Sequence, residues 1–79
     1  MAKYSIVFRQ SVLKDLKEIP KKDVTRIIST IQSLGDDPRP PQSKKLSGQE
    51  RYRLRQGDYR IIYAIEDKVL TVCVVKIGH

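Results

Sequence analysis

The chain has 79 residues, a hydrophobic fraction of 39% and no tryptophan, so we expect a single domain over residues 1–79 with a modest core and no deep enclosed cavity. Its 16 Lys and Arg residues outnumber 9 Asp and Glu residues, which gives a net charge of +7 and an isoelectric point near 9.8. One cysteine and one histidine exclude an internal disulfide and the usual metal-ligand spacings, so no metal or other cofactor is expected.

The first half of the chain predicts one strand followed by two helices. Residues 4–8 are rich in β-branched and aromatic types, which favours a short strand. Residues 9–18 have helical spacing, and Pro20 separates them from a second helix over residues 21–34. Apolar residues of that second helix recur at i, i+3, i+4, i+7 and i+10, the stripe of an amphipathic helix. Gly35 follows as a stop signal.

The second half predicts a connector and three strands. Residues 35–48 contain Asp-Asp-Pro-Arg-Pro-Pro, which cannot propagate a helix. From residue 51 the period changes to two, and strands are expected at 51–55, 59–65 and 69–77, joined by tight turns into an antiparallel meander. The expected fold class is therefore α+β with the order β-α-α-β-β-β, a helical hairpin packed on one face of a small antiparallel-rich sheet.

Two further expectations come from the apolar segments. Cys73 lies in an apolar run, which predicts a small buried core residue. No segment is long and apolar enough to span a membrane, and the N-terminus has no apolar signal-peptide core, so we expect a cytoplasmic protein without a membrane partner.

The excess positive charge is concentrated in residues 39–60, which hold seven basic side chains and two acidic ones, a net of +5. Period-two alternation places Arg51, Arg53 and Arg55 on one face of a strand, and the following hairpin brings Arg60 beside them. Lys44 and Lys45 precede that strand and are expected at its rim. Guanidinium groups held close together repel one another, so such a surface suits a polyanion; an ordinary solvated strand face that prevents aggregation is the alternative.

Chemistry on RNA is one use of such a surface. Fixed cations stabilise the charge that develops on phosphorus when the 2′-hydroxyl attacks. Arginine is a poor base, so these residues suit binding and transition-state stabilisation better than proton removal. Tyr52, Tyr59 and Tyr63 alternate in the same region, and we expect core or cross-strand packing for them, with base stacking as the alternative.

Four short motifs carry a resemblance to a known family. They are KLSG at 45–48, YRLR at 52–55, GDYRIIY at 57–63 and VVKIGH at 74–79. Together with the opening strand and helical hairpin they resemble the toxins of the RelE/ParE superfamily, over the whole chain. The resemblance implies a RelE-like fold and a type II toxin–antitoxin system. Members of this superfamily either cleave mRNA in the ribosomal A site or inhibit DNA gyrase.

The resemblance also implies roles for individual residues. Arg51 and Arg53 stand where the nucleases of the family have lysines that act as base and phosphate ligand, and Arg60 stands at the arginine that stabilises the scissile phosphate. These three are the expected catalytic residues, and Lys44, Lys45 and Arg55 are the expected RNA-binding residues, with no metal. The family pattern continues beyond His79 with an arginine and, later, a tyrosine, so His79 is interpreted as a chain terminus and not as a catalytic residue.

The expected function is a ribosome-dependent endoribonuclease toxin that cleaves mRNA and inhibits translation. Its expected partners are a cognate RelB-like antitoxin, mRNA and the ribosomal A site. Two alternatives stay open: a ParE-like inhibitor of DNA gyrase, and an inactive form without the C-terminal tail that only binds its antitoxin.

Overall fold

The computed structural model describes residues 3–48 and 50–79, which form one five-stranded sheet and two helices. In chain order the elements are β1 (Ser5–Phe8), α1 (Gln10–Lys17), α2 (Lys21–Ser33), β2 (Lys44–Lys45), β3 (Arg51–Gln56), β4 (Tyr59–Glu66), a short 3-10 helix η1 (Asp67–Val69) and β5 (Thr71–Gly78). The strand order across the sheet is β1-β5-β4-β3-β2. β1 runs parallel to β5 and every other pair is antiparallel, so the predicted α+β fold and meander are confirmed.

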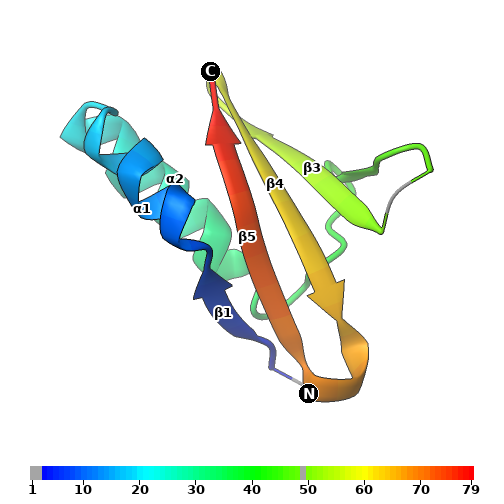
Figure 1. The fold of residues 1–79 in the computed structure, drawn as a ribbon. Helices are drawn as coiled ribbons and strands as arrows, with labels where there is room; N and C mark the ends of the chain where they lie inside the picture. The colour runs from blue at the N-terminus through cyan, green and yellow to red at the C-terminus, as the bar shows by residue number, and fades with distance from the viewer. Residues whose placement is uncertain (1–2, 49) are drawn as a thin grey trace.

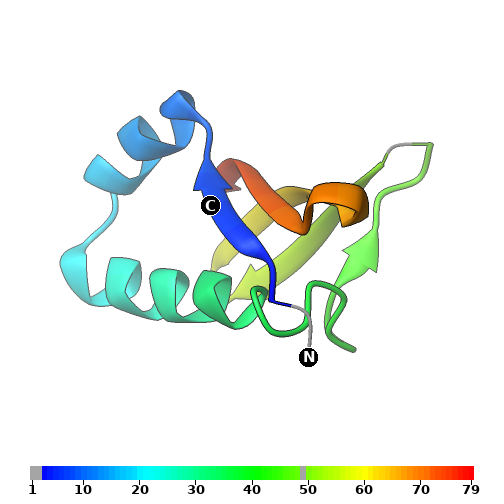
Figure 2. The same ribbon diagram turned by 90° about the horizontal axis from the view of Figure 1, so that it is seen from below.

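Both helices lie on the same side of the sheet (Figures 1 and 2). Their apolar stripes explain this arrangement, because α1 buries Val12 and α2 buries Ile27 and Ile31 against the strands. In the described part of the chain no helix covers the opposite face of the sheet. Neither helix is long and apolar enough to cross a membrane.

The core fills the space between the helices and one sheet face. Its fully or nearly fully buried side chains come from both layers: Val12, Ile27, Ile31, Leu34, Leu54, Ile61, Tyr63, Val72, Val74 and Ile77. Along β3 and β4 these residues alternate with others that point to the uncovered face, as the pleat requires, and on β5 a register shift opposite Ile62/Tyr63 moves the alternation by one residue. The alternation decides which charged strand residues face away from the helices.

Gly35 joins the end of α2 to the start of the sheet. The Tyr4 backbone N–H donates a 2.8 Å hydrogen bond to the Gly35 carbonyl oxygen. A Cβ atom at this glycine would lie 3.1 Å from the Tyr4 carbonyl oxygen and 3.2 Å from that of Gln32. Its φ is not among the positive values of the described residues. The helix therefore stops here, as predicted, but glycine is needed for close backbone approach and not for a left-handed cap.

The structure differs from the sequence-based expectation at three places. β2 lies within the predicted connector, because its two lysines pair with β3 without any apolar signal in the sequence. β5 begins at Thr71, two residues late, since η1 and a left-handed Leu70 (φ 46°) lengthen the turn. Cys73 is only half-buried, and the expectation of a core position was wrong: it pairs with Ala64 and Val7 on the uncovered face.

Candidate nucleic-acid interface

The uncovered face of β3 carries the three arginines that the sequence predicts there. Leu54, which lies between two of them, is 5% exposed and points into the core, so Arg51, Arg53 and Arg55 point the other way. Across to β4, Arg55 is the direct partner of Arg60. The structure therefore brings Arg60 beside the arginine strand, and two guanidinium side chains stand opposite each other, an arrangement that destabilises an isolated sheet.

One row of side chains crosses four strands on this face. Lys44 of β2 pairs with Arg53 of β3, Arg53 with Ile62 of β4, and Ile62 with Lys76 of β5. Neighbouring strands lie about 4.8 Å apart, so the row spans about 14 Å. Lys76 was not among the predicted site residues. Its one signal in the sequence is a single charge within the apolar run of the last strand.

Arg51 lies on the same face of β3, at the end of the strand away from Arg60. It pairs with Ala64, whose next neighbour on β5 is Cys73. It is four residues from Arg55, a distance of about 13 Å along the strand. The cations therefore gather toward the end of the sheet at which β5 finishes. We call Lys44, Arg53, Arg55, Arg60 and Lys76 the basic surface.

Two shallow depressions are formed on the basic surface. The first, which we call the β3 depression, has a volume of about 340 Å³ and is lined by Gln42, Lys44, Arg53 and Arg55. The second, the β5 depression, has a volume of about 210 Å³ and is lined by Arg60, Ile62, Lys76, Gly78 and His79. Each places two or more cations around one concave spot, which suits the oxygens of a phosphate group.

Two other basic residues of the 39–60 segment are engaged elsewhere. Arg39 forms a bidentate ion pair with Asp67, with Nη1–Oδ1 and Nη2–Oδ2 distances of 3.2 and 2.9 Å, and its Nε donates to the Tyr52 hydroxyl at 3.1 Å. Tyr4 donates a further 2.6 Å hydrogen bond to Asp67. These donors, Arg39 first, hold the pKa of the Asp67 carboxyl below its usual value, and the same ion pair raises the pKa of Arg39.

Lys45 lies on the opposite side of β2 from Lys44. It pairs in register with Tyr52, a residue of the helix-facing side, and its ammonium group lies 3.7 Å from Glu50. Lys45 therefore does not join the basic surface, whereas Lys44 does. In the ranges that the structure describes, no carboxylate forms an ion pair with any of the five cations of that surface.

The tyrosines pack in or against the core. Tyr63 is fully buried, its hydroxyl donates a 2.8 Å hydrogen bond to the Pro38 carbonyl oxygen, and burial raises its pKa. Tyr52 stacks on it with ring centroids 5.8 Å apart. Both face the helix side, which confirms the packing interpretation and leaves neither available to stack on bases at the basic surface.

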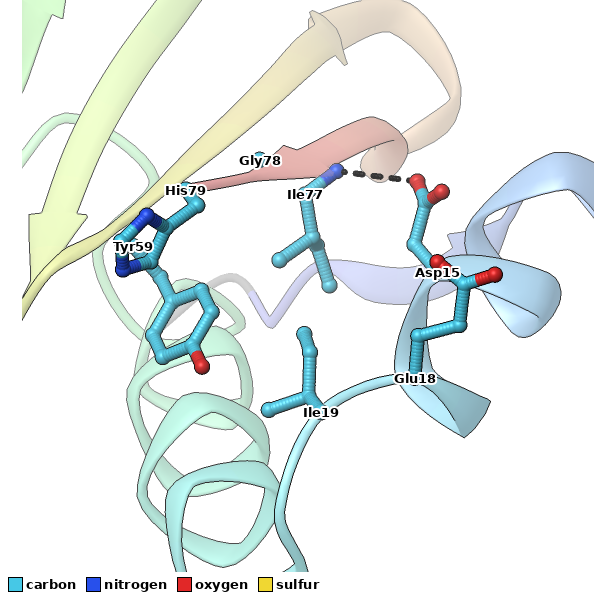
Figure 3. A pocket seen from close by; sticks show the side chains of 7 residues that line it. All are labelled: Asp15, Glu18, Ile19, Tyr59, Ile77, Gly78 and His79. Carbon is cyan, nitrogen blue, oxygen red and sulfur yellow. Dashed lines mark hydrogen bonds between the residues drawn. The ribbon is translucent and has the colours of Figure 1, made fainter.

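A third depression lies on the other side of the β5 terminus (Figure 3). It has a volume of about 270 Å³ and is lined by Asp15, Glu18, Ile19, Tyr59, Ile77, Gly78 and His79. Asp15 accepts a 3.4 Å hydrogen bond from the Ile77 backbone N–H. The His79 ring meets the Tyr59 ring edge-on with centroids 5.3 Å apart, as the view in Figure 3 shows. His79 thus stands between this acidic depression and the β5 depression.

The arrangement can bind a phosphodiester and stabilise negative charge on it. Arginine and lysine side chains on rigid strands need little reorganisation as that charge develops. No group of three or more His, Cys, Asp or Glu side chains that could hold a metal ion occurs within residues 3–48 and 50–79.

Comparison with known proteins places the chain in a family. Residues 6–79 match the family model described as the ParE toxin of the type II toxin–antitoxin system parDE. A Methanocaldococcus jannaschii protein named as a candidate RelE toxin is 29% identical over 76 residues, which cover 89% of this chain and 84% of that protein.

Solved structures of toxin–antitoxin complexes share the fold. The RelE of the RelE–RelB complex from Pyrococcus horikoshii is 30% identical, with a TM-score of 0.86 and coverage of 99% of this chain and 94% of that one. The RelBE2 complex from Mycobacterium tuberculosis matches with a TM-score of 0.88 at 24% identity, covering 98% of each chain. The chain therefore belongs to the ParE toxin family within the RelE/ParE superfamily and is a RelE-like toxin of a type II toxin–antitoxin system.

Proposed function

We propose that this toxin is a ribosome-dependent endoribonuclease that cleaves mRNA and so blocks translation. The observation that carries the proposal is the basic surface, where five cations without a carboxylate partner among the described residues lie on rigid strands. Repulsion among these like charges lowers the stability of the free protein, and a bound polyanion would neutralise the charges. The relationship to RelE toxins supports mRNA as that polyanion.

Arg53 and Arg60 are the proposed ligands of the scissile phosphate, and Lys76 joins them from β5. These side chains lie on three adjacent strands around Ile62. They would stabilise the pentacovalent phosphorus formed when the 2′-hydroxyl attacks, and the product would carry a 2′,3′-cyclic phosphate. Lys44 and Arg55 would hold a neighbouring phosphate in the β3 depression. Arg51, farther along β3, and Lys45, on the other side of the edge strand β2, are proposed as peripheral RNA contacts.

A cognate antitoxin of the RelB type is the proposed protein partner. The similar solved structures from P. horikoshii and M. tuberculosis are toxin–antitoxin complexes. An acidic and apolar antitoxin segment would neutralise the basic surface and exclude RNA from it. Binding of antitoxin and of RNA would then compete for the same cations.

The Arg60→Ala variant tests the proposal in cells. Arg60 belongs to the basic surface and is solvent-exposed, so its loss should abolish growth inhibition and translation arrest while folding is kept. Arg26→Ala is the matched control, because Arg26 is an exposed arginine of α2, on the opposite layer. The control should stay toxic. Full toxicity of the Arg60 variant at equal expression would contradict the assignment.

Inhibition of DNA gyrase is the second candidate, because the matching family model is that of ParE toxins. The two candidates differ in what fails first in the cell. A gyrase inhibitor induces the DNA-damage response before protein synthesis falls, whereas an mRNA nuclease stops protein synthesis first. Pulse labelling of new protein beside a DNA-damage reporter separates the two outcomes.

A further inference from the structure

The β3 depression is lined by three cations and one neutral polar side chain. The side chains of Lys44, Arg53 and Arg55 only donate hydrogen bonds, so they suit the oxygens of a phosphate group. Gln42 completes the lining, and its amide carries an acceptor oxygen beside its amino donors. The volume of about 340 Å³ is that of a small ligand pocket, a class that begins at about 300 Å³. A base can therefore lie in this depression beside a phosphate.

We propose that Gln42 recognises the base of the nucleotide whose phosphate lies in the β3 depression and favours adenine there, an inference that rests on the proposed ribonuclease function. Contacts to phosphate position a nucleic acid, whereas contacts to base edges give sequence preference. Glutamine forms a bidentate pair with adenine, in which it donates to N7 and accepts from the N6 amino group. The three cations cannot form this pair, because the amino group of adenine needs an acceptor.

The amide of Gln42 is available to a ligand, whereas that of a neighbouring glutamine is not. Gln42 is solvent-exposed, and among the residues that the structure describes its side chain makes no hydrogen bond. Gln56, at the end of β3, accepts a 2.7 Å hydrogen bond from the Thr30 hydroxyl. The amide oxygen of Gln56 is therefore already engaged, and that of Gln42 can accept from a base.

The turn that carries Gln42 is closed by two hydrogen bonds. It comprises residues 40–43, and both the backbone N–H and the hydroxyl of Ser43 donate to the Pro40 carbonyl oxygen, at 2.9 and 2.8 Å. Pro41 occupies the second position of the turn, where its restricted φ is favoured. Gln42 follows at the third position. The backbone that presents its amide is therefore held in one conformation.

The same turn is attached to the sheet on both sides. Before it, the hydroxyl of the buried Tyr63 donates a 2.8 Å hydrogen bond to the Pro38 carbonyl oxygen. After it, Lys44 pairs with Arg53 in the β2–β3 ladder. A polar side chain on a fixed backbone loses less conformational freedom on binding and holds its geometry more closely. Gln42 can therefore discriminate between bases, and not only add affinity.

The test measures the cleavage rates of ribosome-bound mRNAs that differ only in the nucleotide before or after the cleaved bond. At one of these positions, wild type should cleave mRNA with adenine about 5–150-fold faster than mRNA with another base, the discrimination of one bidentate pair. Gln42→Ala and Gln42→Met should cleave the four mRNAs at similar rates, and Met keeps the length of the side chain without its hydrogen bonds. Gln32→Ala, at an exposed glutamine of α2, is the matched control and should keep the preference.

Each outcome decides the matter. An adenine preference that either Gln42 variant keeps would overturn the role of Gln42 and leave the proposed ribonuclease function intact. A wild-type preference for another base, or for none, would overturn it as well. A side chain with only a structural role would lower all four rates equally and leave their ratio unchanged, which also contradicts the proposal. An inactive wild type beside a control RelE-type toxin that cleaves the same mRNAs would remove the ribonuclease function, and the role of Gln42 with it.

Discussion

Arg39 and Arg53 carry the same charge, but their surroundings give them different uses. Arg39 is held by Asp67 and by the Tyr52 hydroxyl, so its guanidinium is already engaged and ties residues 36–43 to the β4–β5 turn. Arg53 has no carboxylate partner in the described ranges and lies on the basic surface between Lys44 and Ile62. A residue's charge contributes to RNA binding only where a partner within the protein does not neutralise it.

The Asp67→Asn variant should change the pH dependence of stability. Hydrogen bonds from Arg39 and Tyr4 lower the pKa of Asp67 in the folded protein. A depressed carboxyl pKa contributes stability that is present above the unfolded value, about 3.9, and is lost as pH falls through the lower folded-state value. Wild type should therefore exceed Asp67→Asn in free energy of unfolding at neutral pH, and the difference should shrink in acid, as measured by urea titrations at several pH values.

Glu66→Gln is the control for this prediction. Glu66 is the exposed neighbour of Asp67 and has no ion pair among those of the described residues. Its substitution should leave the free energy of unfolding close to that of wild type at each pH. A difference between wild type and Asp67→Asn that stays constant down to strongly acidic pH would contradict the pKa-based explanation.

At the scale of secondary-structure elements, the apolar periodicity of the sequence predicts both helices and β1, β3, β4 and β5 to within about two residues at their ends. β2 was missed because two lysines in a proline-rich connector carry no strand signal; they become a strand only through hydrogen bonds to β3. The same pairing decides that Lys44 and Lys45 point to opposite sides. Register is a tertiary property, so charge counting could not separate these two residues.

The junction of α2 and β1 should be intolerant of any side chain. In Gly35→Ala, the Cβ would lie 3.1 and 3.2 Å from two backbone carbonyl oxygens, which cannot move as a flexible side chain can. We expect a loss of about 1–3 kcal/mol in free energy of unfolding, as for other overpacked sites. Chemical denaturation of this variant beside Ser29→Ala, at an exposed position of α2, measures it. Equal stability of Gly35→Ala and wild type would contradict this prediction and show that the backbone around residue 35 can move to accommodate a Cβ atom.

At the scale of the whole molecule, the fold separates two surfaces. The helices cover one face of the sheet (Figure 2). They pack against the apolar residues of that face, and the uncovered face carries the basic surface. Two acidic side chains, Asp15 of α1 and Glu18 directly after this helix, lie at the far side of the β5 terminus. Five of the basic side chains of a chain with a net charge of +7 thus gather on the uncovered face, to which a phosphate backbone can bind.

Much of the candidate site could be predicted from the sequence, since Arg51, Arg53, Arg55 and Arg60 follow from strand alternation and a hairpin. Lys76 could not, because its place beside Ile62 depends on the pairing of β4 with β5 and on an irregularity at Ile62/Tyr63. The position of His79 between two depressions is likewise set by packing against Tyr59. These contacts depend on how distant segments of the chain pack together, which local patterns in the sequence do not predict.

Primer-extension mapping of mRNA 5′ ends with purified ribosomes, in the presence and absence of this protein, tests the proposed function most directly. We predict new 5′ ends within codons of the ribosomal A site, which require ribosomes and the toxin together and disappear with Arg60→Ala but not with Arg26→Ala. Unchanged mRNA 5′ ends with correctly folded toxin on translating ribosomes, in a reaction where a control RelE-type toxin cleaves, would contradict the assignment of the basic surface to mRNA cleavage.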